Sequence, residues 1–213
     1  MYIFNKNGRD ERACVAFVSK MYSGIGVEEA NDAPGDLLEE EVRMSTDFIN
    51  FAREKGAGRR IVDIGCGLGR SSKVLAVGCE KYLGIDISPS MVAAAKKFNP
   101  GNEFFCRDIT QPGFRKDEFD TFYWQACVQN IPPKLLEKAL QEVYNATQNG
   151  GLGFITVCEH NKMTMWSLTG WIKNYCVVWN QAEFEKRLRE NGFKILDLKR
   201  ILCDMAFTVE VCK

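Results

Sequence analysis

Residues 60–70 read RIVDIGCGLGR, an apolar run that leads directly into three alternate glycines. The first half of this stretch is rich in isoleucine and valine, which favour a buried β-strand. Gly65, Gly67 and Gly69 then supply a tight turn and bare backbone that a ligand can approach closely. Because a helical pattern follows over residues 70–77, the stretch predicts the strand, loop and helix start of a nucleotide-binding α/β unit.

The sequence beyond this stretch alternates short apolar runs with helical segments, which is typical of a parallel sheet with crossover helices. We expect strands at residues 60–64, 81–86, 103–106, 119–124, 152–158, 194–201 and 205–212. We expect helices at residues 70–77, 89–97, 133–147 and 180–191. The pattern therefore predicts an α/β fold whose seven strands follow a doubly wound order.

Two segments stand outside this alternation. Residues 1–58 are mixed and largely helical, with Asp36 as the expected N-cap of a helix that ends near Lys55. We expect this segment to form a small helical N-terminal cap on a core of residues 59–213. Residues 162–179 form an aromatic insertion that either covers an apolar or cationic ligand as a lid or docks on the core. A 3-to-4 spacing within it predicts one amphipathic helix through Leu168, Trp171, Ile172 and Tyr175.

Charge and composition exclude several classes of protein. The chain has 28 Lys+Arg against 28 Asp+Glu, whereas proteins that grip nucleic-acid backbones carry a surplus of basic residues. No apolar run is long enough to span a membrane, and the N-terminus lacks the apolar region of a secretion signal. Nine cysteines without CxxC spacing and a single histidine give little support for a metal site. We expect a cytoplasmic protein with reduced thiols and no metal, membrane or nucleic-acid partner.

Acidic residues stand at the ends of the first three predicted strands. Asp63 precedes the first glycine, and the glycine spacing differs from the dinucleotide pattern G-x-G-x-x-G. Asp86 closes the second strand, where a carboxylate can accept two hydrogen bonds from vicinal ribose hydroxyls. Asp108 follows the third strand at the edge where an adenine ring would lie, with Ile109 available to pack on its face. A simple helix-capping role for the strand-end acids stays open.

The segment from Arg60 to about Val157 resembles the class I S-adenosylmethionine-dependent methyltransferases. IVDIGCGLG is similar to their first motif, GIDIS to the second, CRDI to the third, and EFDTFYWQACVQNI to the fourth with its following loop. NGGLGFITV resembles their fifth strand after a "pGG" turn, with Asn149 where proline is frequent. The resemblance implies a Rossmann-like, mostly parallel sheet with helices on both faces and an antiparallel C-terminal strand. It also implies S-adenosyl-L-methionine as methyl donor, with S-adenosyl-L-homocysteine as product.

The resemblance assigns this chain's residues to a donor site. The three glycines would hold the methionine and ribose portion, Asp86 the ribose, and Asp108 with Ile109 the adenine. Arg70 would pair with the donor's carboxylate, because a guanidinium matches that group's geometry, and a solvated arginine at a helix start is the alternative. The full set of expected donor-site residues is Asp63, Gly65, Gly67, Gly69, Arg70, Asp86, Ile87, Asp108, Ile109 and Gln125.

The methyl acceptor is expected beside the ends of the fourth and fifth strands. Gln125 is the expected donor-side contact there, and Asn130 is either an acceptor contact or a helix cap. His160 is the only histidine in the chain, so it is the one side chain whose ordinary pKa lies near neutrality. An exposed loop histidine is the alternative for that residue. Gln125, Asn130 and His160 are therefore the candidate catalytic residues.

Two kinds of acceptor compete. The short length, the helical cap and the aromatic insertion are similar to small-molecule N- or O-methyltransferases, which implies an amine, carboxylate or hydroxyl acceptor. GLGRSSK, YWQACVQNI and EHN are also similar to protein α-N-terminal methyltransferases, but Ala126 or Cys127 stands where their second tryptophan would be. We favour the small-molecule acceptor. A donor-binding subunit without catalysis and a NAD-dependent enzyme are further alternatives, and the sequence leaves the oligomeric state open.

Overall fold

The computed structural model describes residues 2–5, 35–159, 175–201 and 204–213. A main sheet is built from β2 (Arg60–Ile64), β3 (Lys81–Asp86), β4 (Glu103–Cys106), β5 (Phe119–Trp124), β6 (Thr147–Cys158), β8 (Phe193–Ile201) and β9 (Asp204–Val211). A separate two-stranded sheet pairs β1 (Tyr2–Asn5) with β7 (Tyr175–Val178). The helices are α3 (Gly35–Glu54), α4 (Ser72–Leu75), α5 (Pro89–Phe98), α6 (Pro133–Ala146) and α8 (Gln181–Glu190), with a 3₁₀ turn, η1 (Val128–Asn130).

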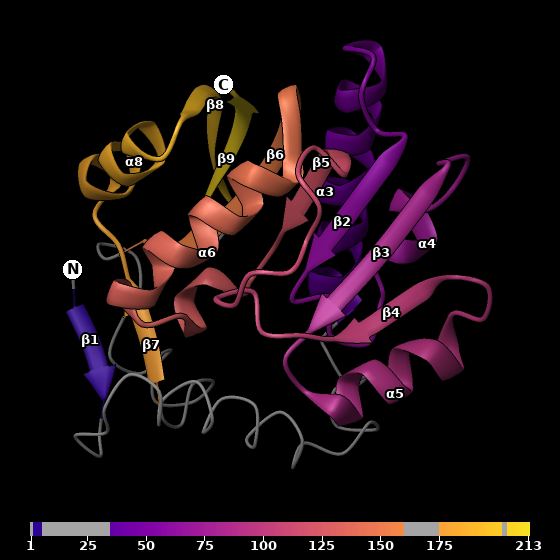
Figure 1. The fold of residues 1–213 in the computed structure, drawn as a ribbon. Coiled ribbons are helices and arrows are strands. Elements are labelled where there is room, and N and C mark those ends of the chain that lie inside the picture. The colour runs from indigo at the N-terminus through magenta and orange to yellow at the C-terminus, as the bar shows by residue number, and fades with distance from the viewer. Residues whose placement is uncertain (1, 6–34, 160–174, 202–203) are drawn as a thin grey trace.

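The main sheet has the strand order β4-β3-β2-β5-β6-β9-β8 (Figure 1). Neighbouring strands are parallel except at β9, which runs antiparallel to both β6 and β8. The chain builds outward from β2 to β4 and then returns to place β5 on the other side of β2, so the order reverses between β2 and β5. Ligands of open α/β sheets bind outside the carboxyl ends of the strands at such a switch point. The predicted Rossmann-like sheet with its antiparallel C-terminal strand is confirmed.

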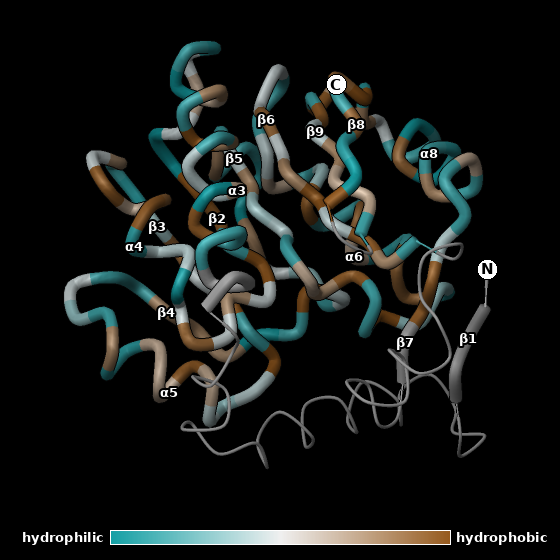
Figure 2. The backbone as a smooth tube through the Cα atoms, turned by 180° about the vertical axis from the view of Figure 1, so that it is seen from behind, coloured by the Kyte–Doolittle hydropathy of each residue, from teal (hydrophilic) through white to brown (hydrophobic). Residues whose placement is uncertain are grey.

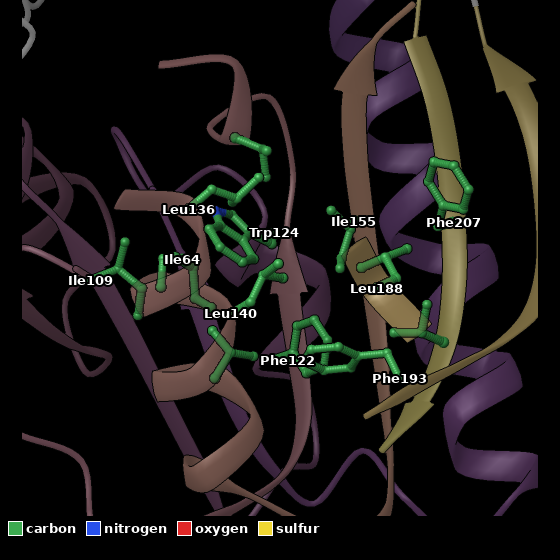
Figure 3. Close-up of a cluster of buried hydrophobic side chains, with 14 of the residues drawn as sticks. Ile64, Ile109, Phe122, Trp124, Leu136, Leu140, Ile155, Leu188, Phe193 and Phe207 are labelled. Carbon is green, nitrogen blue, oxygen red and sulfur yellow. The ribbon is translucent and has the colours of Figure 1, made fainter. Parts of the chain in front are cut away.

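Helices cover both faces of the sheet, and each face has its own buried cluster. One cluster contains Phe48 of α3 and Leu75 of α4 together with residues of α5. The other contains Leu140 of α6 and Leu188 of α8, and it includes the side chains drawn in Figure 3. Figure 2 shows hydrophobic and hydrophilic residues alternating along the helices, as expected for helices with one face on a core. The sheet therefore buries one hydrophobic cluster on the face covered by α3 and a second cluster on the face covered by α6.

The structure corrects three expectations about element boundaries and type. Asp36 lies within the first turn of α3, which begins at Gly35, so the N-cap prediction is wrong. Tyr175 lies in β7 and not in a helix, because pairing with distant β1 overrides the local 3-to-4 spacing. Residues 2–5 form a strand where a helical cap was expected. The other three residues of the predicted amphipathic helix lie outside the described residues, and the division at residue 58 stays a prediction.

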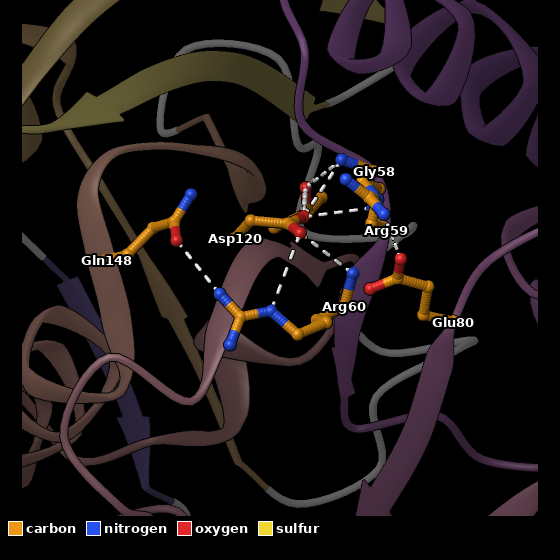
Figure 4. A network of polar contacts seen from close by, with 7 residues as sticks. Gly58, Arg59, Arg60, Glu80, Asp120 and Gln148 are labelled. Carbon is orange, nitrogen blue, oxygen red and sulfur yellow. Dashed lines mark hydrogen bonds and ion pairs between the residues drawn. The ribbon is translucent and has the colours of Figure 1, made fainter.

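The carboxylate of Asp120, near the start of β5, binds the backbone at the start of β2 (Figure 4). Its side chain is buried, and its Oδ1 accepts hydrogen bonds from the backbone N–H groups of Gly58 at 2.9 Å and Arg59 at 3.1 Å. Its Oδ2 accepts a hydrogen bond from the backbone N–H of Arg60 at 2.9 Å. One side chain thus satisfies three successive backbone donors and fixes where the strand that carries the glycine loop begins.

Asp120→Ala is expected to lower the free energy of unfolding by about 3 kcal/mol, because the partly buried N–H groups of Arg59 and Arg60 lose their hydrogen bonds to the carboxylate. Chemical denaturation followed by circular dichroism measures the change. Glu190→Ala is the matched control: that side chain is exposed and, among the described residues, forms an ion pair with Lys186, so about 0.5 kcal/mol or less is expected. Equal losses in the two variants would contradict the anchoring role of Asp120.

Candidate functional site

The glycine loop lies at the switch point between β2 and β5. The backbone N–H groups of Gly65 and Cys66 both donate to the carbonyl oxygen of Ile85, at 2.8 and 3.0 Å, which ties the loop to the end of β3. Gly65, Gly67 and Gly69 have φ angles of 71°, 53° and 73°, in the left-handed region where side chains with a Cβ are strained. The loop therefore depends on glycine for its backbone path, as the sequence predicts.

The three glycines face different surroundings. A Cβ at Gly65 would lie 2.6 Å from the Sγ of Cys127, and one at Gly69 would lie 2.8 Å from the ring of Phe104. A Cβ at Gly67 would meet none of the described residues within 4 Å. Gly65 and Gly69 are thus packed against the protein, whereas Gly67 has no such neighbour in the part of the chain that the structure describes. Burial raises the pKa of the Cys127 thiol to about 12, so this cysteine stays neutral beside the loop.

Asp86 joins the glycine loop to the start of α5. Its Oδ2 accepts the backbone N–H of Gly67 at 2.9 Å, and its Oδ1 accepts the backbone N–H of Ser88 at 2.8 Å. Burial raises the pKa of Asp86, and backbone hydrogen bonds from Ser88, Gly67 and Ile87 oppose that rise. A carboxylate has about four lone-pair positions, so Asp86 keeps some capacity to accept a hydrogen bond from a ligand hydroxyl beside Gly67.

Asp63 is a buried acid on the α3 face of β2. Its Oδ2 accepts a hydrogen bond from the hydroxyl of Tyr82 at 2.7 Å, and its side chain is 2% exposed. Burial raises the pKa of Asp63 to about 7; the Tyr82 bond opposes the rise, while the charges of Asp86 and Glu41 add to it. Asp63 is therefore suited to bind a cationic ligand group, because a nearby positive charge favours the ionised form of its carboxyl.

Arg70 is engaged by a residue that the sequence does not single out. Its Nε and Nη2 contact the two carboxylate oxygens of Glu41 in α3, at 2.9 and 3.0 Å. This two-point contact is the geometry that was expected between Arg70 and the donor's carboxylate. Here the contact joins α3 to the segment that follows the glycine loop. A contact between Arg70 and the methyl donor stays a prediction.

The predicted adenine-site residues lie beyond the end of β4. The Oδ1 of Asp108 accepts the backbone N–H and the hydroxyl of Thr110, at 2.8 and 2.7 Å, so it holds the local turn. Ile109 is buried in the same cluster as Ile64 and Trp124 (Figure 3). Ile87 is half-buried directly after Asp86. Their contacts with an adenosyl group stay predictions.

The end of β5 carries the candidate acceptor-side residues. Trp124 is fully buried in the core on the α6 face of the sheet. Its side chain therefore packs in the core and does not line a ligand site. Gln125 is half-buried, and its Oε1 accepts a hydrogen bond from the hydroxyl of Tyr123 at 2.9 Å. Asn130 is half-buried at the end of η1 and has partners of its own. His160 lies outside the described residues. The pairing of β5 with β2 ends at Tyr123 and Asp63, so Gln125 follows two residues beyond it, while Cys127 is the residue packed against Gly65.

A cavity of about 330 Å³ opens at the carboxyl end of β6. It is lined by Glu159, Trp179, Asn180, Gln181, Ala182, Glu185 and Arg200. Glu159 is buried, and the Nε of Arg200 contacts its two carboxylate oxygens at 3.2 and 3.1 Å. The sequence places Glu159 on this rim but gives no signal for Arg200, which belongs to β8 and meets Glu159 only through the fold.

Within the described part of the chain, no group of three or more His, Cys, Asp or Glu side chains is arranged to hold a metal ion. No helix among the described residues is long and apolar enough to cross a membrane.

Comparisons with known proteins agree with this geometry. Residues 61–151 match the family model described as "Methyltransferase domain". The chain is 26% identical over 136 residues to a demethylmenaquinone methyltransferase of Paenarthrobacter aurescens, covering 63% of this chain and 53% of that protein. It is 28% identical to the chloroplastic tocopherol O-methyltransferase of Arabidopsis thaliana, covering 58% of this chain and 38% of that protein. The chain thus spans about half or less of the length of these relatives.

Solved structures extend the likeness to most of the chain. The Burkholderia thailandensis 1,6-didemethyltoxoflavin-N1-methyltransferase, with bound substrate and S-adenosylhomocysteine, superimposes with a TM-score of 0.73 at 15% identity, covering 96% of this chain and 92% of that one. The magnesium protoporphyrin IX methyltransferase of Synechocystis, with bound S-adenosylhomocysteine, gives a TM-score of 0.71 at 18% identity, covering 94% and 100%. At such identities the likeness establishes the fold alone. The family match and the fold together confirm the resemblance: the chain carries a methyltransferase domain with the fold of the class I S-adenosylmethionine-dependent methyltransferases.

Proposed function

We propose that this chain is a methyltransferase that uses S-adenosyl-L-methionine to methylate an amine, carboxylate or hydroxyl of a small molecule. The observation that carries the proposal is the pairing of Gly67 with Asp86: a loop glycine whose Cβ position touches no other described residue lies beside a carboxylate that keeps some acceptor capacity. This arrangement fits a ribose with two adjacent hydroxyls. The relatives' names describe methyl transfer to a quinone, a tocopherol and a porphyrin, which supports a small-molecule acceptor.

When bound, S-adenosyl-L-methionine supplies a methyl group already activated by its attachment to a positively charged sulfur. The chain's own task is then to align the acceptor and to exclude water. Asp86 would orient the ribose, and Asp63 would meet the ammonium of the donor's amino-acid end. Gln125 would form the wall between the two ligands, because it directly follows β5, the strand beside β2 at the switch point. Strong general-base power is not required of any described residue.

The cavity beside Glu159 is the proposed acceptor site. Its volume of about 330 Å³ lies at the lower end of the range for small-molecule pockets. Its lining is polar, with the buried Glu159 held by Arg200, so it suits an acceptor with a polar or charged group. The balanced charge of the chain gives no support for a nucleic-acid acceptor.

The direct test supplies purified protein with S-adenosyl-L-methionine and either a pool of small metabolites or a set of peptides with free N-termini. Mass spectrometry reads which compounds gain a methyl group. Methylated metabolites are expected. Methylation confined to the peptides would show the α-N-terminal alternative, and binding of the donor without any product would show a binding subunit.

Asp86→Ala is expected to weaken the binding of S-adenosyl-L-homocysteine by about 100-fold or more, because two hydrogen bonds to a charged group are lost together. Isothermal titration calorimetry measures the affinity. Asp197→Ala removes an exposed carboxylate from β8 and is the control that should leave it unchanged. Wild-type affinity in folded Asp86→Ala would rule out the ribose assignment.

The binding of S-adenosyl-L-homocysteine is expected to depend on pH through Asp63. Because the ionised carboxylate attracts the ligand's ammonium, affinity should rise as the pH increases through about 7 and level off above it. Binding near neutrality should release protons, which calorimetry detects in buffers of different ionisation enthalpy. Asp63→Asn keeps the shape of the side chain and should abolish both effects. A pH profile that is the same in Asp63→Asn and in the wild type would place the titrating group elsewhere.

A further inference from the structure

The cavity at the carboxyl end of β6 contains a buried carboxylate with few hydrogen-bond donors. Glu159 is 6% exposed, and its two carboxylate oxygens share the single Nε–H of Arg200, at 3.2 and 3.1 Å. A carboxylate has about four positions that accept hydrogen bonds, and a buried charge is costly unless it is well paired. Among the described residues, no other group donates to this carboxylate. Glu159 can therefore accept further hydrogen bonds from a ligand in the cavity.

The ion pair between Glu159 and Arg200 is unequal. The Arg200 side chain is 43% exposed, against 8% for the Glu159 side chain, so water solvates the guanidinium much better than the carboxylate. The Nη2 of Arg200 also donates to the Oε1 of Gln181 at 2.6 Å. The carboxylate thus depends on a cation for its stability, whereas the guanidinium has other partners.

A chain of side-chain contacts continues from Arg200 along α8. The amide of Gln181 accepts from Arg200 and donates through its Nε2 to the Oε1 of Glu185 at 2.7 Å, so both partners fix its orientation. The Oε2 of Glu185 accepts the Nη1 of Arg189 at 3.0 Å. The bond from Gln181 lowers the pKa of Glu185; burial opposes this change and the bond from Arg189 adds to it. The cavity lining therefore carries two carboxylates, of Glu159 and Glu185, and one guanidinium.

The N-terminus of α8 also borders the cavity, and a helix N-terminus attracts anions. Here the chain itself supplies the partners. The Oδ1 of Asn180 accepts the backbone N–H of Ala182 at 2.9 Å, and Glu183 places negative charge in the first turn. The helix end therefore does not require an anionic ligand. The excess of carboxylates in the lining favours a cationic one, because a cleft lined by one sign of charge concentrates the opposite sign.

From these contacts we propose that the cavity binds the methyl acceptor through a protonated amine, whose N–H groups donate to the carboxylate of Glu159. In the proposed function this cavity is the acceptor site, so the inference rests on that function and narrows the acceptor to molecules that carry an amine. Arg200 is the cation that shares Glu159 with the ligand, and Gln181 holds Arg200 on its other side. Alkyl amines are positively charged at neutral pH, as the lysine side chain is.

Three probes with the same phenylethyl body test which polar group the cavity selects. They are 2-phenylethylamine, 3-phenylpropionate and 2-phenylethanol, which carry an amine, a carboxylate and a hydroxyl. Ligand-detected NMR titrations with the whole chain measure their affinities. The amine should bind about 10-fold or more tightly than the other two probes. Preference for the carboxylate or the alcohol, or no binding of the amine, would overturn the inference.

Glu159→Gln tests whether the amine binds at this carboxylate. The substitution keeps the shape of the side chain and removes its charge, so the affinity for 2-phenylethylamine should fall about 10-fold or more. Glu190→Gln is the matched control, because it makes the same change of charge at an exposed residue of α8 outside the cavity lining. It should leave the affinity unchanged. Unchanged affinity in folded Glu159→Gln would overturn the inference.

Arg200→Gln tests the sign of the charge that the cavity recognises. Removal of the guanidinium removes the cation that competes for Glu159, so 2-phenylethylamine should bind several-fold more tightly. Weaker binding of the amine, together with loss of 3-phenylpropionate binding, would show an anion site built on Arg200 and would overturn the inference. The test with Glu159→Gln does not depend on the stability of Arg200→Gln.

S-adenosyl-L-homocysteine separates this inference from the proposed function. Its affinity, measured by calorimetry, should be the same in Glu159→Gln and in the wild type, because Glu159 makes none of the contacts that shape the glycine loop. Wild-type protein that binds the amine but not S-adenosyl-L-homocysteine would overturn the proposed function. Wild-type protein that methylates carboxylates or alcohols but no amine-bearing molecule would overturn only the amine inference.

Discussion

The bond between the carboxylate of Asp86 and the backbone of Gly67 is the contact on which the donor half of the site depends. It fixes the middle of the glycine loop, while Gly65 and Gly69 are packed against protein on either side. The second oxygen of Asp86 holds the start of α5 through Ser88. A single acid thus places the loop and a helix start relative to each other and still has lone pairs to offer a ligand.

The two faces of the sheet have different chemistry, and the difference explains where the polar groups gather. Near the carboxyl ends of β2 and β5, the α6 face is filled with apolar side chains such as Ile64 and Trp124. The α3 face carries the Asp63 carboxyl, the Tyr123 hydroxyl and the Glu41 contact with Arg70. Because buried polar groups must be paired, α3 supplies partners for this face, which makes the helix part of the site and not a separate cover.

The sequence predicts the positions of the glycine loop and of Asp86 in the fold well, because their signals are local. The glycine loop and Asp86 each follow directly from an apolar strand, so their positions come with the strand pattern. The partners of these residues could not be predicted in the same way. Ser45 and Glu41 are ordinary polar residues of a helix, and only the packing of α3 brings them to Tyr123 and Arg70. Tyr175 shows the same limit for secondary structure, since its strand exists through pairing with residues near the N-terminus.

The cavity beside Glu159, which we propose as the acceptor site, is assembled from parts that are further apart in the chain. Glu159 ends β6, Arg200 comes from β8, and the start of α8 closes the cavity between them. None of these elements contributes a side chain to the bonds that shape the glycine loop. Changes in the lining of the cavity can therefore alter what fits there without disturbing Asp86 or Gly67. The glycine loop and the cavity are therefore built by separate sets of contacts, as expected where sites of different function are supported by one fold.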